Sequence, residues 1–249
     1  MQEKPEKIAG GLGSAAGPVF SRRGYLLFSD VAANRILKWE KGAVSTFREK
    51  SNGAKGNSFD HQGRLLTCEN GRVTRTEKDG KITVLASGLK APCDLVYAID
   101  GSIYVADPEA SAVYQIMRKG ELRPAARDAE HPSGVALAPN QQRLFVADTG
   151  HNQVRVYDVA ADGALMGGRV FAGTAERPSG LKTDESGGVW VACPSGIQRL
   201  DASGRPVGNI ALPGPANNCN WGEGFRDLFV TAGTGVYRVA AKVNGTRTY

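Results

Sequence analysis

The stretch SGVALAPNQQRLFVAD, residues 133–148, contains a short apolar strand, a polar turn and a second apolar strand that ends in an acid. Related stretches begin at five other places in the chain. They are AGPVFSRRGYLLFSD from Ala16, KGNSFDHQGRLLTCE from Lys55, CDLVYAIDGSIYVAD from Cys93, SGLKTDESGGVWVAC from Ser179 and, more weakly, NCNWGEGFRDLFVTA from Asn218. A unit that recurs in this way indicates a repeat architecture.

The spacing of these stretches indicates which architecture it is. Successive starts are 39, 38, 40, 46 and 39 residues apart. This period suits four short strands per unit and is too long for a leucine-rich repeat. We expect the second strand of a unit, such as residues 64–68, to alternate in character. The sequence predicts an all-β fold, a six-bladed β-propeller that forms a single domain over residues 1–249, with blades starting near residues 16, 55, 93, 133, 179 and 218.

The two ends of the chain indicate how the ring closes. The last unit ends after its third strand, at residues 236–240, and residues 7–12 precede the first unit as an unassigned strand. An unpaired sheet edge is a liability that propellers avoid. We therefore predict that the N-terminal strand pairs into the last blade.

Composition excludes several function classes. The chain has 249 residues, of which 41% are hydrophobic and 22% are charged, with a formal net charge of +6. Lysine and arginine are scattered singly along turns rather than gathered with aromatic residues, so we expect no nucleic-acid partner. No apolar run approaches the ~20 residues that a membrane span needs. We expect a soluble monomer or small homo-oligomer, either cytoplasmic or exported with its signal removed.

Cysteines and acids each have a structural interpretation. The four cysteines lie far apart without a Cys-x-x-Cys pair, so the sequence favours free, buried thiols over a zinc site or disulfides. The second strands end in Asp30, Glu69, Asp107, Asp148 and Cys193. We interpret these acids as turn caps that accept hydrogen bonds from backbone amides, rather than as a functional ring of carboxylates.

Longer phrases carry a resemblance to a known family. They are AGPVFSRRGYLLFSDVAANRILKW, NGAKGNSFDHQGRLLTCENGRVTR, APCDLVYAIDGSIYVADP, HPSGVALAPNQQRLFVADTG and RPSGLKTDESGGVWVACPSGI. Together they resemble the senescence marker protein, gluconolactonase and luciferin-regenerating enzyme family over essentially the whole chain. The resemblance implies a six-bladed propeller that hydrolyses lactones and related esters with a calcium or zinc ion in its central tunnel.

The positions at which that family places its metal ligands hold different residues in this chain. The resemblance assigns the family's glutamate position to Ala16, its asparagine position to Ser133 and its aspartate position to Ser179. Cys93 stands where the family has an asparagine close to the metal or substrate, and Lys55 stands at a further position that often carries asparagine. Because these changes concentrate on one tunnel mouth, we infer a pocket remodelled by engineering or by specialised divergence.

The chemistry of these replacements disfavours a metal. A hard divalent cation needs several oxygen ligands, usually with carboxylates, whereas Ala16 offers none and serine hydroxyls are poor substitutes. A charged Lys55 would repel such a cation by several kcal/mol at an effective dielectric constant of about 20. The sequence therefore predicts no metal and no other cofactor.

Lys55 is the leading candidate for a reactive group. Desolvation disfavours the charged form of a lysine, and the neutral amine can attack a carbonyl carbon and form a Schiff base. Retro-aldol cleavage or a related carbonyl reaction is one hypothesis. The alternative is a lysine that extends to solvent at the tunnel mouth without a chemical role.

Cys93 and His131 form a second catalytic hypothesis. A cysteine is nucleophilic as a thiolate, which needs a nearby cation or base. Lys55 would supply the charge and His131 the base of a Cys/His esterase. The alternatives are a small buried filler at Cys93 and a polar residue at the start of a strand at His131.

The remaining candidates are expected to shape the pocket. They are Ala16, Ser133, Ser179, Asn217, Asn218 and Trp221, with core packing as the alternative for Trp221. The preferred interpretation is a remodelled pocket that acts on a small carbonyl or ester compound. Two alternatives stay open: a propeller that binds a small molecule without catalysis, and a metal-dependent lactone hydrolase with shifted ligands such as Asp94, Asp107 or the asparagine pair.

Overall fold

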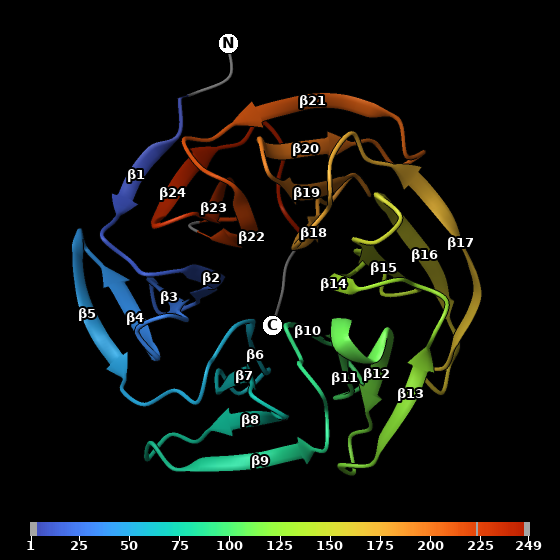
Figure 1. Cartoon of the computed structure of the whole chain (residues 1–249), viewed down its shortest axis with the longest axis horizontal. Helices are drawn as coiled ribbons and strands as arrows, with labels where there is room; N and C mark the ends of the chain where they lie inside the picture. Colours follow the sequence, from blue (N-terminus) through green and yellow to red (C-terminus); the bar gives the residue numbers. More distant parts are fainter. Residues whose placement is uncertain (1–3, 223, 247–249) are drawn as a thin grey trace.

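The computed structural model describes residues 4–222 and 224–246. Within them, six four-stranded antiparallel sheets stand around a central axis like the blades of a propeller (Figure 1). One short 3-10 turn, η1 (Pro108–Ala110), is the exception to strands and loops in this part of the chain. The predicted all-β, six-bladed propeller is confirmed.

Blades one to three follow chain order from the axis outward. The first contains β2 (Ala15–Ser21), β3 (Tyr25–Asp30), β4 (Arg35–Glu40) and β5 (Ala43–Arg48). The second contains β6 (Asn57–Phe59), β7 (Leu65–Glu69), β8 (Arg72–Thr76) and β9 (Ile82–Ser87). The third contains β10 (Asp94–Tyr97), β11 (Ile103–Asp107), β12 (Ala112–Ile116) and β13 (Leu122–Ala126).

Blades four to six continue the same order. The fourth contains β14 (Pro132–Leu137), β15 (Arg143–Asp148), β16 (Gln153–Val159) and β17 (Leu165–Gly173). The fifth contains β18 (Leu181–Thr183), β19 (Val189–Cys193), β20 (Gly196–Leu200) and β21 (Pro206–Ala211). The sixth contains β22 (Ala216–Gly222), β23 (Asp227–Ala232), β24 (Gly235–Ala240) and, from the other end of the chain, β1 (Glu6–Ala9).

The pairing of β1 closes the ring. Glu6 lies opposite Arg238 and Lys7 opposite Tyr237 in an antiparallel ladder. The predicted N-terminal closure is confirmed, although the paired strand ends at Ala9 rather than at Leu12. Leu12 continues the contact through its backbone N–H, which donates to the carbonyl of Thr234. The outer edge of β24 is thereby covered.

The second strands differ from the expected alternation. Every residue of β7, β11 and β19 is buried, and β15 is buried from Leu144 onward. Each blade packs a neighbour on both of its faces, so both side-chain directions of an inner strand face protein. The expectation of alternating burial for residues 64–68 was therefore wrong.

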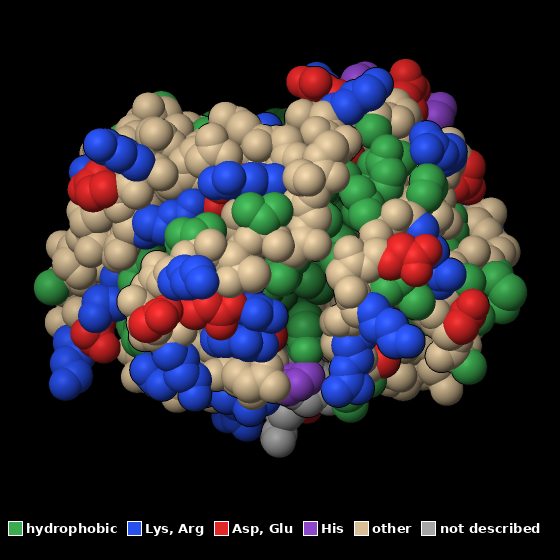
Figure 2. All heavy atoms as spheres, turned by 90° about the horizontal axis from the view of Figure 1, so that it is seen from below, with side chains coloured by type: hydrophobic (Ala, Val, Ile, Leu, Met, Phe, Trp, Pro, Cys, Tyr) green, Lys and Arg blue, Asp and Glu red, His purple; other side chains and the backbone are tan. Residues whose placement is uncertain are grey.

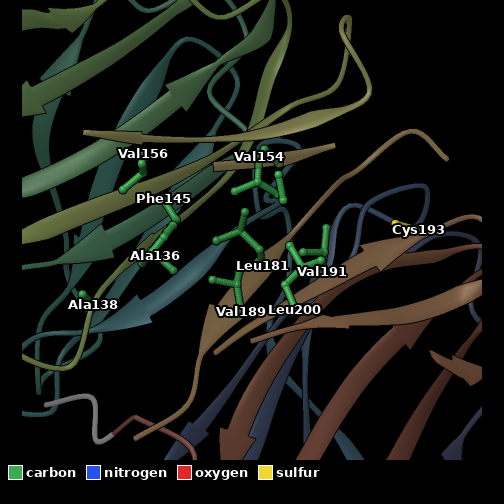
Figure 3. Packing of buried hydrophobic residues seen from close by; sticks show 12 residues of the cluster. Ala136, Ala138, Phe145, Val154, Val156, Leu181, Val189, Val191, Cys193 and Leu200 are labelled. Atoms are coloured by element: carbon green, nitrogen blue, oxygen red, sulfur yellow. The ribbon is translucent and has the colours of Figure 1, made fainter. Parts of the chain in front are cut away.

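Apolar contact between blades holds the ring together. Between blades four and five, Phe145 packs toward Leu181, Val189 and Val191 (Figure 3). Leu181, Val189 and Val191 have no exposed surface. Full burial of such a side chain contributes about 1.5–3 kcal/mol to stability. Each apolar contact surface between two neighbouring blades is therefore a substantial source of stability.

The surface carries mixed charge. Figure 2, a view turned by 90° from Figure 1, shows lysine and arginine side chains distributed over one face of the molecule with acidic side chains among them. Ion pairs between charged side chains of the described residues include Arg64 with Asp60 and Arg169 with Asp158. In the part of the chain that the structure describes, no helix is long and apolar enough to cross a membrane.

Candidate functional site

The inner strands enter the propeller from the same end, and a cavity of about 240 Å³ lies where they begin. It is lined by Ser14, Ala16, Val31, Lys55, Cys93, Asp94, Ser133, Ser179, Gly180, Asn217 and Asn218. Seven of the nine site residues proposed from the sequence line this cavity. They come together because the inner strand of each blade starts beside the axis.

His131 and Trp221 lie elsewhere. His131 is exposed and does not line the cavity, although it precedes Ser133 by two residues. Trp221 lies four residues beyond Asn217 on β22. Because a strand advances about 3.3 Å per residue, Trp221 lies further along the axis, toward its opposite end. There its indole N–H donates to the carbonyl of Thr183 at 2.7 Å, and 2% of the residue is exposed.

Three of the strand-end acids fix the loops that lead into the cavity. Asp30 accepts hydrogen bonds from the backbone N–H groups of Gly13 and Ser14 at 3.0 and 3.1 Å. Asp107 accepts from the N–H groups of Lys90 and Ala91 at 2.7 and 3.0 Å. Asp148 accepts from the N–H of Glu130 at 2.9 Å. The turn-capping interpretation of these acids is confirmed.

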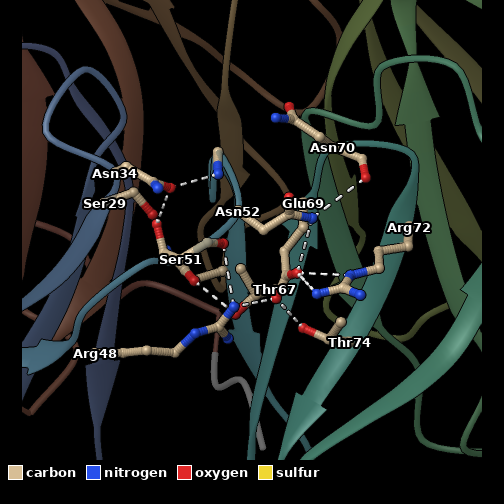
Figure 4. A network of polar contacts seen from close by, with 12 residues as sticks. Ser29, Asn34, Arg48, Ser51, Asn52, Thr67, Glu69, Asn70, Arg72 and Thr74 are labelled. Atoms are coloured by element: carbon tan, nitrogen blue, oxygen red, sulfur yellow. Dashed lines mark hydrogen bonds and ion pairs between the residues drawn. The ribbon is translucent and has the colours of Figure 1, made fainter.

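Glu69 performs a related task through side chains. Its carboxylate accepts from the Thr74 hydroxyl at 2.6 Å and from Arg72 Nε at 2.8 Å, and it also pairs with Arg48 (Figure 4). Burial alone would raise the pKa of Glu69, but the hydrogen bonds from Thr74 and Arg48 hold it below the ordinary value. Asn52 also donates to it, which links the network to the loop before Lys55.

A buried lysine lies close to the buried carboxylate of Asp94, which lines the cavity. Asp94 Oδ2 lies 3.9 Å from Lys182 Nζ and accepts from the Val135 N–H at 3.2 Å. Burial raises the pKa of Asp94 above the ordinary value, and Lys182 opposes that effect. Lys182 Nζ also donates to the carbonyl of Leu181 at 3.0 Å. Asp94 is therefore already engaged by protein groups.

The backbone of Lys55 is fixed while its amine is not. The Lys55 N–H donates to the carbonyl of Cys68 at 2.9 Å, and its carbonyl accepts from the Ser29 hydroxyl at 2.9 Å. Among residues 4–222 and 224–246, no group forms a hydrogen bond or ion pair with Lys55 Nζ. The amine is thus available to a molecule in the cavity.

Cys93 has the opposite character. Its Sγ lies 3.2 Å from the carbonyl oxygen of Ser133, to which the thiol donates. Burial, together with the nearby Asp94 carboxylate, raises the pKa of Cys93 to about 12. The protonated thiol is thus the form present at neutral pH, and a thiol is a poor nucleophile.

Two serine hydroxyls stand together on the wall formed by blades four and five. The Oγ atoms of Ser133 and Ser179 lie 3.4 Å apart. Glycine makes this approach feasible, because a Cβ atom on Gly134 would lie 2.4 Å from the Ser179 carbonyl oxygen. The pair presents two hydroxyl groups side by side to the cavity.

Fold and cavity together define a class of protein: a six-bladed propeller with a small polar pocket at one mouth of its axis. The family described as SMP-30/Gluconolactonase/LRE-like region matches residues 14–234. The chain belongs to this family.

Individual relatives agree with this assignment. A gluconolactonase of Zymomonas mobilis subsp. mobilis is 28% identical, with 96% of this chain and 82% of the relative covered. The structure of a gluconolactonase from Xanthomonas campestris has a TM-score of 0.88 at 29% identity, covering 94% of this chain and 88% of the other. A luciferin-regenerating enzyme has a TM-score of 0.85 at 16% identity, covering 98% of each chain, and shows the shared fold.

The residues of the cavity do not suit the divalent cation that the family resemblance implies. Among the described residues that line it, Asp94 carries the one carboxylate, and Lys182 and Val135 already engage it. The other oxygen donors are neutral, and Lys55 adds a cation. The described part of the chain contains no group of three or more His, Cys, Asp or Glu residues that could hold a metal ion. This donor set is a poor match for calcium, and Cys93 and Asp94 are fewer than the three or four Cys, His or carboxylate ligands that a zinc site uses.

Two charged residues at or beside the site, Lys182 and Asp94, were not predicted in their present roles from the sequence. Lys182 was not considered, although it stands on a buried strand and lines a second, smaller cavity of about 40 Å³ together with Ala136 and Asn220 of the neighbouring blades. The signal in the sequence that could have revealed Lys182 was a single charged residue on an inner strand whose other residues are small or neutral. Asp94 was considered as a metal ligand, whereas the structure shows it paired with that lysine.

Proposed function

We propose that the central cavity acts on a small carbonyl or ester compound without a bound metal, and that the Lys55 amine is the reacting group. The observation that carries this proposal is the Lys55 amine, which has no hydrogen-bond or ion-pair partner among the described residues and stands among groups that are neutral or already paired. The cavity volume of about 240 Å³ suits a compound of few heavy atoms.

Comparison with the neighbouring groups favours Lys55 over Cys93. The Cys93 thiol donates to Ser133 and has a raised pKa, and His131 does not reach the cavity to act as its base. Lys55, in its neutral form, has a lone pair that can attack a carbonyl carbon. A Schiff base would then activate the adjacent carbon–carbon bond for cleavage, as retro-aldol chemistry requires.

The first experiment measures metal content and lactone hydrolysis before and after chelation. We expect purified protein to contain less than stoichiometric divalent metal, and a chelator to leave any turnover unchanged. The second experiment treats the protein with a ketone and borohydride, which should attach a reduced adduct to Lys55 in the wild type and none at this site in Lys55→Gln. Lys78→Gln, an exposed lysine in a turn, is the matched control. Failure to find an adduct at Lys55 would refute the Schiff base.

A lactone hydrolase is the second candidate function, because the relatives that match this chain over most of its length carry the names gluconolactonase and lactonase. Stoichiometric metal with chelator-sensitive lactone hydrolysis would select it, with Asp94 and Asn218 as the first ligands to test. Saturable binding of a small molecule without turnover would instead select a binding propeller.

A further inference from the structure

We propose that the compound taken by this cavity is a small 2-oxo acid, whose carbonyl carbon reacts with Lys55 and whose carboxylate is held by the hydroxyl pair of Ser133 and Ser179. The proposal rests on the function proposed above and specifies its substrate class. It follows from the charge of the cavity, the serine pair and the size of the space.

The charge of the cavity favours an anion. Lys55 is the one cation and Asp94 the one carboxylate among the described residues that line the cavity. Lys182, which lies 3.9 Å from Asp94 behind the cavity wall, offsets that carboxylate. Among the described residues that line the cavity, no second carboxylate balances the charge of Lys55. A ligand that carries one negative charge balances it, whereas a neutral ligand does not.

The serine pair supplies hydrogen-bond donors for that anion. The two hydroxyl oxygens are 3.4 Å apart, too far for a strong mutual hydrogen bond, so each hydroxyl hydrogen is free to turn toward a ligand. A carboxylate has two acceptor oxygens on one carbon and matches two adjacent donors. The backbone on either side is fixed, because the Ser133 carbonyl accepts from Cys93 and the Ser179 N–H donates to Ala192.

The size of the cavity favours a small ligand in which the carboxylate and the reactive carbonyl group are close together. A space of about 240 Å³ accommodates a short oxo acid whose anionic group and reactive carbonyl are neighbours. In a 2-oxo acid the carboxylate and the ketone occupy neighbouring carbons. Ala16 and Val31, which also line the cavity, offer apolar surface to the remaining carbon chain.

The covalent step balances without an added reagent. Once the Lys55 ammonium has given up a proton to solvent, its nitrogen forms a bond to C2, and the carbonyl π electrons move to oxygen, which takes up a proton. The nitrogen passes one proton to solvent, and the C2 hydroxyl takes up a second proton. The C2–oxygen bond then breaks with loss of one water, and the nitrogen gives up its remaining proton as the imine forms. Borohydride in the trapping experiment adds a hydride to C2 and yields a stable secondary amine.

The test compares pyruvate with methyl pyruvate in borohydride trapping. Both have an activated ketone, and they differ in the charge of the neighbouring group. We expect pyruvate to label Lys55 at a concentration at least about tenfold lower than methyl pyruvate, since hydrogen bonds to a charged group are worth about this factor or more. The mass of the labelled peptide should rise by the mass of the oxo acid less one water plus two hydrogens.

The variant Ser133→Ala/Ser179→Ala isolates the carboxylate contacts. We expect it to raise the concentration needed for labelling more for pyruvate than for methyl pyruvate, so that most of the preference is lost. Labelling of Lys55 by methyl pyruvate in the variant also shows that the protein is folded and the amine competent. Equal labelling of the wild type by both compounds, or a preference that survives in the variant, would overturn the oxo-acid proposal and leave the role of Lys55 standing. Labelling of Lys55 by neither compound would refute both.

Discussion

Lys182 Nζ lies 3.9 Å from Oδ2 of Asp94, a residue that lines the central cavity, and both side chains are almost completely buried. The two residues come from blades three and five and meet near the axis. Burial disfavours both charges, and each is tolerated because of the other. The stability of the propeller therefore depends on the charge states of Lys182 and Asp94, and so does the electrostatic potential at the cavity.

Replacing Lys182 with methionine should destabilise the protein by about 2–4 kcal/mol at neutral pH, because a buried carboxylate is left without its cation. The pKa of Asp94, already raised by burial, should rise further. Below that pKa the carboxyl is neutral, so the loss caused by Lys182→Met should shrink as pH falls toward 4. Chemical denaturation at several pH values measures this, with Lys119→Met at an exposed turn as control. An equal loss at every pH would contradict the coupling.

The cysteines should resist alkylation in the folded protein. Burial raises the pKa of Cys93 and Cys219 to about 12 and that of Cys193 to about 11, and raises that of Cys68 well above its ordinary value. At pH 8 a thiol with a pKa of about 12 is ionised to roughly one part in 10⁴, and the thiolate is the reactive form. Iodoacetamide followed by intact mass should show four additions after unfolding and almost none before. Rapid native labelling of Cys93 would revive the cysteine nucleophile.

Glu69→Gln should cost about 2–4 kcal/mol at pH 7, because Arg48 and Arg72 lose a buried partner. The pKa of Glu69 is lower in the folded protein than in the unfolded chain. The contribution of the Glu69 carboxylate to the free energy of unfolding is therefore fully present above the pKa of glutamate in the unfolded chain, about 4.3. It is lost as pH falls through the pKa of Glu69 in the folded protein. The difference between wild type and variant should accordingly narrow in acid, as measured by urea denaturation. Glu109→Gln, at an exposed position, is the control, and a gap that stays constant with pH would be inconsistent with this account.

Gly134→Ala should destabilise the protein by about 1–3 kcal/mol and weaken ligand binding in the cavity. The added Cβ would lie 2.4 Å from the Ser179 carbonyl oxygen, so blades four and five must move apart and separate the serine pair. Gly173→Ala meets no atom within 4 Å and should be nearly neutral. Thermal unfolding and a binding titration with pyruvate report the two effects. A neutral Gly134→Ala would show that the two strands adjust freely.

Restoring the residue types that the family resemblance assigns to the metal should create a cation site. The variant Ala16→Glu/Lys55→Asn/Ser133→Asn/Ser179→Asp places two carboxylates and two amides around the cavity and removes the competing ammonium. We expect calcium to bind to this variant and to raise its Tm, while the wild type shows neither effect by calorimetry. Calcium binding of equal strength in the wild type would show that its present residues are sufficient.

The repeated phrases determined the fold, because each blade is specified locally by two apolar strands, a polar turn and a glycine or aspartate at the turn. The missing fourth strand after residue 240 and the extra strand before Ala16 also sufficed to predict the pairing of β1 with β24. The same periodicity placed Ala16, Lys55, Cys93, Ser133 and Ser179 around one mouth, since equivalent positions of a repeat lie at equivalent heights along the axis.

What the sequence by itself determined is thus the number of blades, their order, the closure of the ring and the set of positions that converge. Only the tertiary structure decided that Lys182 pairs with Asp94, that His131 is exposed, that Trp221 lies toward the other end of the axis and that Lys55 Nζ has no partner among the described residues. The physical reason is that strand pattern fixes which side a residue faces and how far along the axis it lies. Which side chains from different blades then meet depends on how the blades pack, and repeat spacing does not encode that packing.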